Sequence, residues 1–91
     1  KEHPLAKLQS DFLLLRAQVL LMFGRANEAL LEIDSFKALN PDSPFQIPAD
    51  FHRACALAEL GQREAAVKIW SFIAARYPKH ELAAEAAALC R

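Results

Sequence analysis

The sequence predicts an all-α domain built from stacked helical hairpins. Hydrophobic residues make up 54% of the 91 residues, and 18 Ala and 14 Leu stand against only two Gly, a composition typical of helix-on-helix packing. The chain also repeats itself at an offset of 37 residues, and the identical residues that it pairs include Arg16 with Arg53, Ala17 with Ala54, Leu20 with Leu57, Gly24 with Gly61, Ala29 with Ala66 and Pro41 with Pro78. Each unit is therefore expected to be two helices joined by a glycine turn.

The first helix is predicted over Leu5–Phe23, with Pro4 in its first turn and Gly24 just past its end. Its apolar residues recur at steps of three and four: Leu5, Leu8, Phe12, Leu15, Val19 and Met22. The half from Phe12 to Phe23 is apolar on nearly every face, so more than one neighbour must cover it. We expect a partner or a second copy of the chain to do so.

The second helix is predicted from about Asn27 to Leu39. Asn27 and Glu28 stand where a capping side chain and a carboxylate complement the free N–H groups of a helix start. Asn40-Pro41 closes the helix, because the residue before a proline is disfavoured in the helical region.

A connector over Asn40–Pro48 holds three of the five prolines, and its Phe45 and Ile47 are expected to attach it to the domain. The third helix then runs from about Ala49 to Leu60, where Gly61 ends it.

The fourth helix is predicted from about Arg63 to Arg76 and a last one over Glu81–Cys90. Trp70, Phe72 and Tyr77 allow two interpretations. They form an aromatic docking patch, or Trp70 is a core residue and Tyr77 packs against the next helix pair; helical spacing favours the second interpretation.

The repeated residues resemble the tetratricopeptide repeat family, whose unit has a small residue in the first helix, a turn glycine, a small residue early in the second helix and a terminal proline. The matching residues are Ala17, Gly24, Ala29 and Pro41 in one unit, Ala54, Gly61, Ala66 and Pro78 in the next, and Ala88 in a third. Departures from the pattern are Arg16 and Arg53, where a bulky apolar residue is usual, and Phe36 and Ile73, where a small one is usual.

This resemblance implies a right-handed α-α solenoid of two hairpins plus a final helix. All of it belongs to a single domain over residues 1–91. The repeats are expected at 10–41 and 47–78, and residues 79–91 form a partial third repeat or capping helix.

Composition argues against several function classes. Eleven basic residues balance eleven acidic ones without a basic cluster, so nucleic-acid binding is not expected. The longest uncharged stretch, Ala17–Gly24, is far too short for a membrane span.

Motifs for catalysis or cofactor binding are missing from the sequence. His3, His52 and His80 are scattered without metal-ligand spacing, and His80 is expected in a capping or surface role. Cys55 and Cys90 lack a CxxC arrangement and are expected to be free thiols; a redox function would need a thiolate near neutral pH. We expect no enzyme, no cofactor and no metal site.

Arg16 and Arg53 also allow two interpretations. They bind an anion in a groove, or their stems cover apolar surface while their charged ends reach water or a carboxylate, for which Glu59, Glu64 and Glu81 are candidates.

In the family that the chain resembles, first helices line a concave surface that binds peptides. Carried over to this sequence, the partner-binding residues are Asp11, Leu14, Gln18, Leu21, Met22, Phe51, Cys55, Ala58, Glu59, Leu82, Glu85 and Leu89. The Lys and Asn of the family's carboxylate clamp are replaced here by Leu14 and Gln18, which argues against binding of chaperone tails. The mostly apolar groove suits an amphipathic helix or an extended hydrophobic segment.

The expected function is a non-enzymatic protein-interaction module, including the case of a small secretion-type chaperone. The alternative is a trimmed segment of a larger repeat scaffold, or a self-associating structural domain. A cytoplasmic location is expected. The bacterial periplasm is the alternative, because the segment from Tyr77 to Ala86 is similar to repeats of bacterial envelope proteins.

Overall fold

A computed structural model describes residues 4–90, with side chains from residue 12 onward. The described residues form five helices and no strand, which confirms the all-α prediction. In chain order these are α1 (Pro4–Met22), α2 (Ala26–Leu39), α3 (Gln46–Glu59), α4 (Arg63–Arg76) and α5 (Ala83–Leu89).

The two glycine turns share one geometry. Gly24 has φ +74° and Gly61 has φ +86°, a left-handed backbone that favours glycine. In both turns the N–H of the residue after the glycine donates over 2.8 Å to the carbonyl five residues before it, and the glycine N–H donates over 3.0 Å to the carbonyl three residues before it. The repeat in the sequence is thus a repeat of local structure.

Two local predictions were wrong. Helix α2 begins one residue before Asn27, which is exposed; its N-cap residue is Arg25, and no side chain makes a capping hydrogen bond. Glu28 in the first turn instead pairs with Arg25, with 3.0 Å between Nη2 and Oε2. Helix α3 begins at Gln46, because Pro48 is compatible with a first turn, where a backbone N–H has no partner within the helix.

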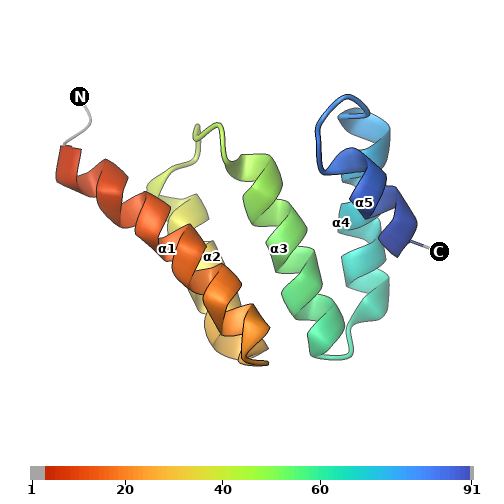
Figure 1. The fold of residues 1–91 in the computed structure, drawn as a ribbon, viewed down its shortest axis with the longest axis horizontal. Helices are drawn as coiled ribbons and strands as arrows, with labels where there is room; N and C mark the ends of the chain where they lie inside the picture. Colours follow the sequence, from red (N-terminus) through yellow and green to blue (C-terminus); the bar gives the residue numbers. More distant parts are fainter. Residues whose placement is uncertain (1–3, 91) are drawn as a thin grey trace.

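The helices form two layers, with α1, α3 and α5 on one side and α2 and α4 on the other (Figure 1). Helix α1 packs on α2 and α3 packs on α4, while α2 also packs on α3 and α4 on α5. The Cα atoms extend over 41 × 29 × 17 Å, so the molecule is two helices thick. These contacts are those of stacked helical hairpins; the right-handed solenoid remains a prediction.

Helix α3 belongs to both hydrophobic clusters and joins the two hairpins. One cluster contains Leu14, Ala17, Ala29, Ile33, Phe36 and Ala49. The other contains Phe51, Ala54, Leu57, Ala66, Trp70, Ile73 and Ala86. Trp70 is therefore a core residue as predicted, and its ring centroid lies 6.4 Å from that of Phe51. The large residues Phe36 and Ile73 are fully buried despite their departure from the repeat pattern.

Arg16 and Arg53 both pair with carboxylates of α2, but with different ones. Arg16 Nε lies 3.8 Å from Glu32 Oε2 inside its own hairpin, whereas Arg53 Nε lies 3.2 Å from Asp34 Oδ1 and so crosses from α3 to α2. The three glutamates expected as partners were wrong, because both arginines point toward α2. Half-exposed pairs of this kind contribute about 0–1 kcal/mol each.

Candidate interaction site

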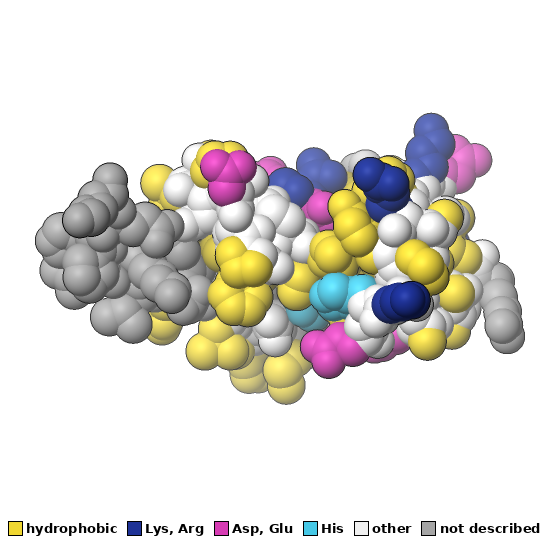
Figure 2. All heavy atoms as spheres, turned by 90° about the horizontal axis from the view of Figure 1, so that it is seen from above, with side chains coloured by type: hydrophobic (Ala, Val, Ile, Leu, Met, Phe, Trp, Pro, Cys, Tyr) yellow, Lys and Arg dark blue, Asp and Glu magenta, His cyan; other side chains and the backbone are white. Residues whose placement is uncertain are grey.

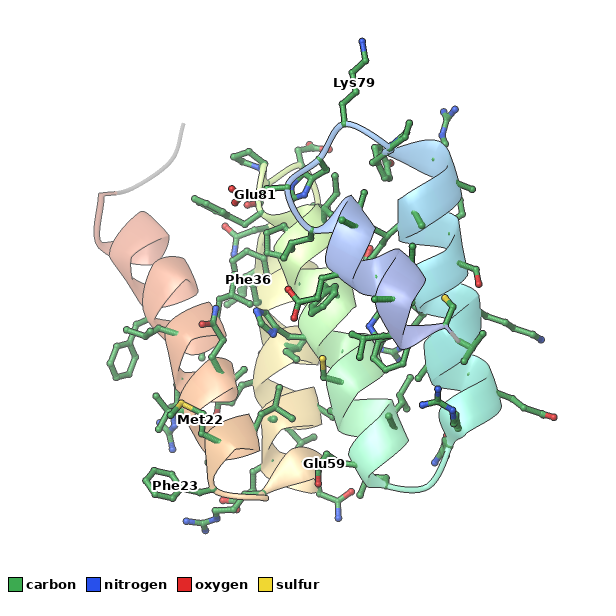
Figure 3. All side chains as sticks on the ribbon, turned by 45° about the vertical axis from the view of Figure 1, so that its right-hand side comes forward. Met22, Phe23, Phe36, Glu59, Lys79 and Glu81 are labelled. Atoms are coloured by element: carbon green, nitrogen blue, oxygen red, sulfur yellow. The ribbon has the colours of Figure 1, made fainter. Side chains whose placement is uncertain are left out.

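The side of the molecule formed by α1, α3 and α5 carries most of the residues predicted to bind a partner. We call it the inner-helix face (Figure 3). Three of the predicted residues are exposed: Met22, Glu59 and Glu85. Six more are half-buried: Gln18, Leu21, Cys55, Ala58, Leu82 and Leu89. Asp11 was also predicted, but its side chain lies outside the described residues.

Leu14 and Phe51 are corrections to the predicted site. Leu14 is 7% exposed in the cluster between α1 and α2, and Phe51 is 4% exposed against Trp70. Ala17 and Ala29 are fully buried and small, so the helices of the first hairpin approach closely and enclose Leu14. Both side chains stabilise the fold and offer no surface to a partner.

Glu85 of α5 lies close enough to two side chains of α3, His52 and Cys55, to influence their pKa values. Burial lowers the pKa of His52 from its ordinary value, and the Glu85 carboxylate partly offsets this shift. Burial, together with the carboxylates of Glu85 and Glu59, raises the pKa of the Cys55 thiol to about 11. His52 is then neutral at pH 7, and Cys55 does not supply the thiolate that a redox function would need.

Polar contacts hold α5 and the loop before it in place. Arg63 Nη2 donates to the Leu89 carbonyl over 3.0 Å, and Cys90 Sγ lies 3.3 Å from Ser71 Oγ. Both cysteines are free thiols, as predicted. His80 Nδ1 accepts a hydrogen bond from the Leu82 N–H over 3.0 Å in the turn before α5, and α5 itself has no side-chain capping hydrogen bond.

A second apolar surface lies on α1, where sequence reasoning named only Met22 as a site residue. We call Phe12, Leu15, Val19 and Met22 the open face; they are 59%, 57%, 42% and 82% exposed. Phe23 adjoins it and is 75% exposed; Met22 and Phe23 project from the end of α1, away from the other helices (Figure 3). The sequence signal for this surface was the spacing of apolar residues along α1 at steps of three and four, and the residues of the open face point outward.

The equivalent face of α3 is covered at two of its four positions. Ala49 and Ala56 stand 37 residues after Phe12 and Val19, and both are fully buried. Ala49 belongs to the hydrophobic cluster of the first hairpin, where α2 packs on α3. At these two positions the first helix is covered in the second unit and uncovered in the first, while the equivalents of Leu15 and Met22, His52 and Glu59, are half-buried and exposed.

A cavity of about 420 Å³ lies on the opposite side of the molecule, between α2, α3 and α4. Two ion pairs from α2 to α3 border it, Lys37 with Asp50 and Arg53 with Asp34. Its remaining lining is Lys68, Ile69, Phe72 and Ile73. Because residues from three helices line this cavity, no local sequence pattern predicted it. Phe72 is 57% exposed and stacks edge-on against Tyr77, with 6.1 Å between ring centroids.

Other chemistry finds no support in the described part of the chain. No three His, Cys, Asp or Glu side chains among residues 12–90 are placed to hold a metal ion. None of the described helices has both the length and the apolar character needed to cross a bilayer. Lys and Arg side chains are interspersed with acidic and apolar ones on the face shown in Figure 2.

Comparisons with known proteins do not identify the chain: no family model, no curated protein and no solved structure matches it. The tetratricopeptide resemblance therefore stays a prediction.

Proposed function

We propose that this chain is a non-enzymatic protein-interaction module that binds an amphipathic helix of a partner along the inner-helix face. An extended hydrophobic segment is the other predicted form of the partner. Support comes from the apolar side chains that remain accessible there, which include Leu21 on α1, Leu89 on α5 and Leu82, the residue just before α5. Apolar positions on neighbouring helices suit the apolar stripe of a partner helix.

The observation that carries the proposal is a pair of exposed carboxylates on this surface. Glu59 of α3 and Glu85 of α5 are exposed, and neither forms an ion pair with a described Lys or Arg. His52 beside Glu85 is neutral at pH 7 because burial lowers its pKa. A partner helix with Lys or Arg flanking its apolar stripe fits this combination, since charge complementarity selects partners and speeds association.

The test is a titration with two synthetic helical peptides that share a leucine stripe and carry either Lys or Glu on the polar side. The Lys peptide should bind at least about tenfold more tightly, a difference of about 1.4 kcal/mol.

Matched variants test whether the preference for the Lys peptide depends on this surface or on exposed carboxylates in general. A Glu59→Gln/Glu85→Gln double variant should lose the preference for the Lys peptide, whereas Glu64→Gln, which removes an exposed carboxylate of α4, should keep it. Equal binding of both peptides, or equal effects of the two variants, would refute the proposed surface.

A small secretion-type chaperone is the narrower form of this proposal, and a segment of a larger repeat scaffold is the alternative. Both rest on the resemblance to the repeat family. The inner-helix face serves either role, because each requires a partner segment bound across successive helix pairs.

A further inference from the structure

The open face of α1 is large for an uncovered apolar surface. Its four residues, together with Phe23, expose roughly 500 Å² of mostly apolar area, given typical side-chain areas. Monomeric soluble proteins rarely leave a contiguous apolar patch of more than a few hundred Å² uncovered. At two of the four equivalent positions of α3, Ala49 and Ala56, the chain covers its own surface, because α2 packs on α3.

We propose that a second copy of the chain covers the open face, with the two α1 helices antiparallel about a two-fold axis. In this arrangement Phe12 lies opposite Met22 of the second copy, and Leu15 lies opposite Val19 of the second copy. The largest ring meets the most adaptable side chain, and a longer aliphatic residue meets a shorter one. A two-fold interface requires this kind of self-complementarity.

The spacing of the residues supports a helix as the occupant. Steps of three, four and three residues from Phe12 to Met22 are those of the seam of a two-helix coiled coil. Two open faces with their adjoining Phe23 side chains together bury at most roughly 1,000 Å², which is the lower limit for a specific interface. We therefore expect a weak dimer with a dissociation constant of about 1–100 µM.

The charges favour a second copy over a charged partner helix. The open face contains no charged residue, so a basic or acidic helix gains no electrostatic complementarity there. Arg16 borders it, and its Nε lies 3.8 Å from Glu32 Oε2, which reduces repulsion between the two copies. The sequence also has a formal net charge of zero.

The first test is sedimentation equilibrium of the 91-residue chain over about 1–200 µM, the range that spans the expected dissociation constant. The mass should rise from 10.1 kDa toward twice that value. Leu15→Lys should stay monomeric at every concentration with unchanged helicity, and Val19→Lys serves if Leu15→Lys does not fold. Leu31→Lys is the matched control, because Leu31 is 68% exposed on α2 and should leave the dimer intact.

The second test fixes the orientation by cross-linking. In a Cys55→Ala/Cys90→Ala background, Phe12→Cys and Met22→Cys copies should form a mixed disulfide, whereas Phe12→Cys alone should form little. A monomer at every concentration, a dimer that Leu15→Lys leaves intact, or efficient self-linking of Phe12→Cys would overturn the proposal. None of these results bears on the inner-helix face, whose peptide titration is separate.

Discussion

Phe12 and Val19 on α1 and Ala49 and Ala56 on α3 stand at equivalent positions of the two repeated units, yet their surroundings differ. The alanines are fully buried, while Phe12 and Val19 are 59% and 42% exposed. Where α2 packs on α3, the residues are small enough for close approach; on the side of α1 that no described helix covers, they are large. The comparison shows that the same position of the repeated unit is buried where a neighbouring helix packs on it and exposed where none does.

The largest effect on stability should come from the buried contact between α2 and α3. Phe36→Ala removes a fully buried ring from the cluster that contains Ala49, and should lower the free energy of unfolding by about 3–5 kcal/mol. Phe12→Ala removes the same group from the open face and should cost within about 0.5 kcal/mol in dilute protein. Urea denaturation followed by circular dichroism measures both. Similar losses of stability in the two variants would contradict the exposure of Phe12 on the open face.

A second pair of variants adds volume at equivalent positions. Ala56→Leu forces a larger side chain between α2 and α3 and should destabilise by about 1–3 kcal/mol, whereas Val19→Leu should change stability by less than about 0.5 kcal/mol. Thermal melts of the two variants provide the measurement. Tolerance of Leu at position 56 would contradict the close packing between α2 and α3.

The glycine turns should respond alike, in contrast to the two faces. Gly24→Ala and Gly61→Ala should each cost about 1 kcal/mol, because both glycines have positive φ. A Cβ at either position meets nothing within 4 Å, so backbone strain is the whole cost. Chemical denaturation of each variant checks the equality, and a neutral result at either glycine would break the equivalence of the units.

The smallest effect is a pH dependence. Because folding lowers the pKa of His52, the folded state binds fewer protons than the unfolded state just below pH 6.5. Stability should be complete above that pH and should fall as the pH drops through 6.5 toward the lowered pKa.

Two variants test whether His52 is the source of this pH dependence. His52→Gln should flatten it between pH 7.5 and 5, and Glu85→Gln should steepen it, because Glu85 raises the pKa of His52. Denaturation midpoints across the pH range decide this, and an unchanged slope in His52→Gln would rule out His52 as the source.

The helices followed from sequence because their causes are local. Proline, glycine and apolar spacing set the ends of α2 and α4 within about a residue, since backbone sterics act at those positions themselves. The start of α3 was misplaced because Pro48 fits any position of a first turn.

The surfaces were harder to predict because they depend on which side of each helix finds a neighbour. Helix α1 is apolar on nearly all sides over Phe12–Phe23, so its periodicity did not show that Leu14 and Ala17 face inward. Phe51 was placed on the partner surface by the register of the repeat family, but Trp70 of α4 packs against it. Cys55, Glu59 and Glu85 retained accessible surface, as expected of a binding site.

The contrast between the two faces is tested most directly by thiol labelling at one pair of equivalent positions. In a Cys55→Ala/Cys90→Ala background, Val19→Cys in dilute protein should react as fast as an unfolded peptide and slow as the concentration rises. Ala56→Cys should react at least about a hundredfold more slowly at every concentration, because labelling there requires the helices to separate. Equal rates at the two positions in dilute protein would contradict the contrast between a covered and an uncovered face.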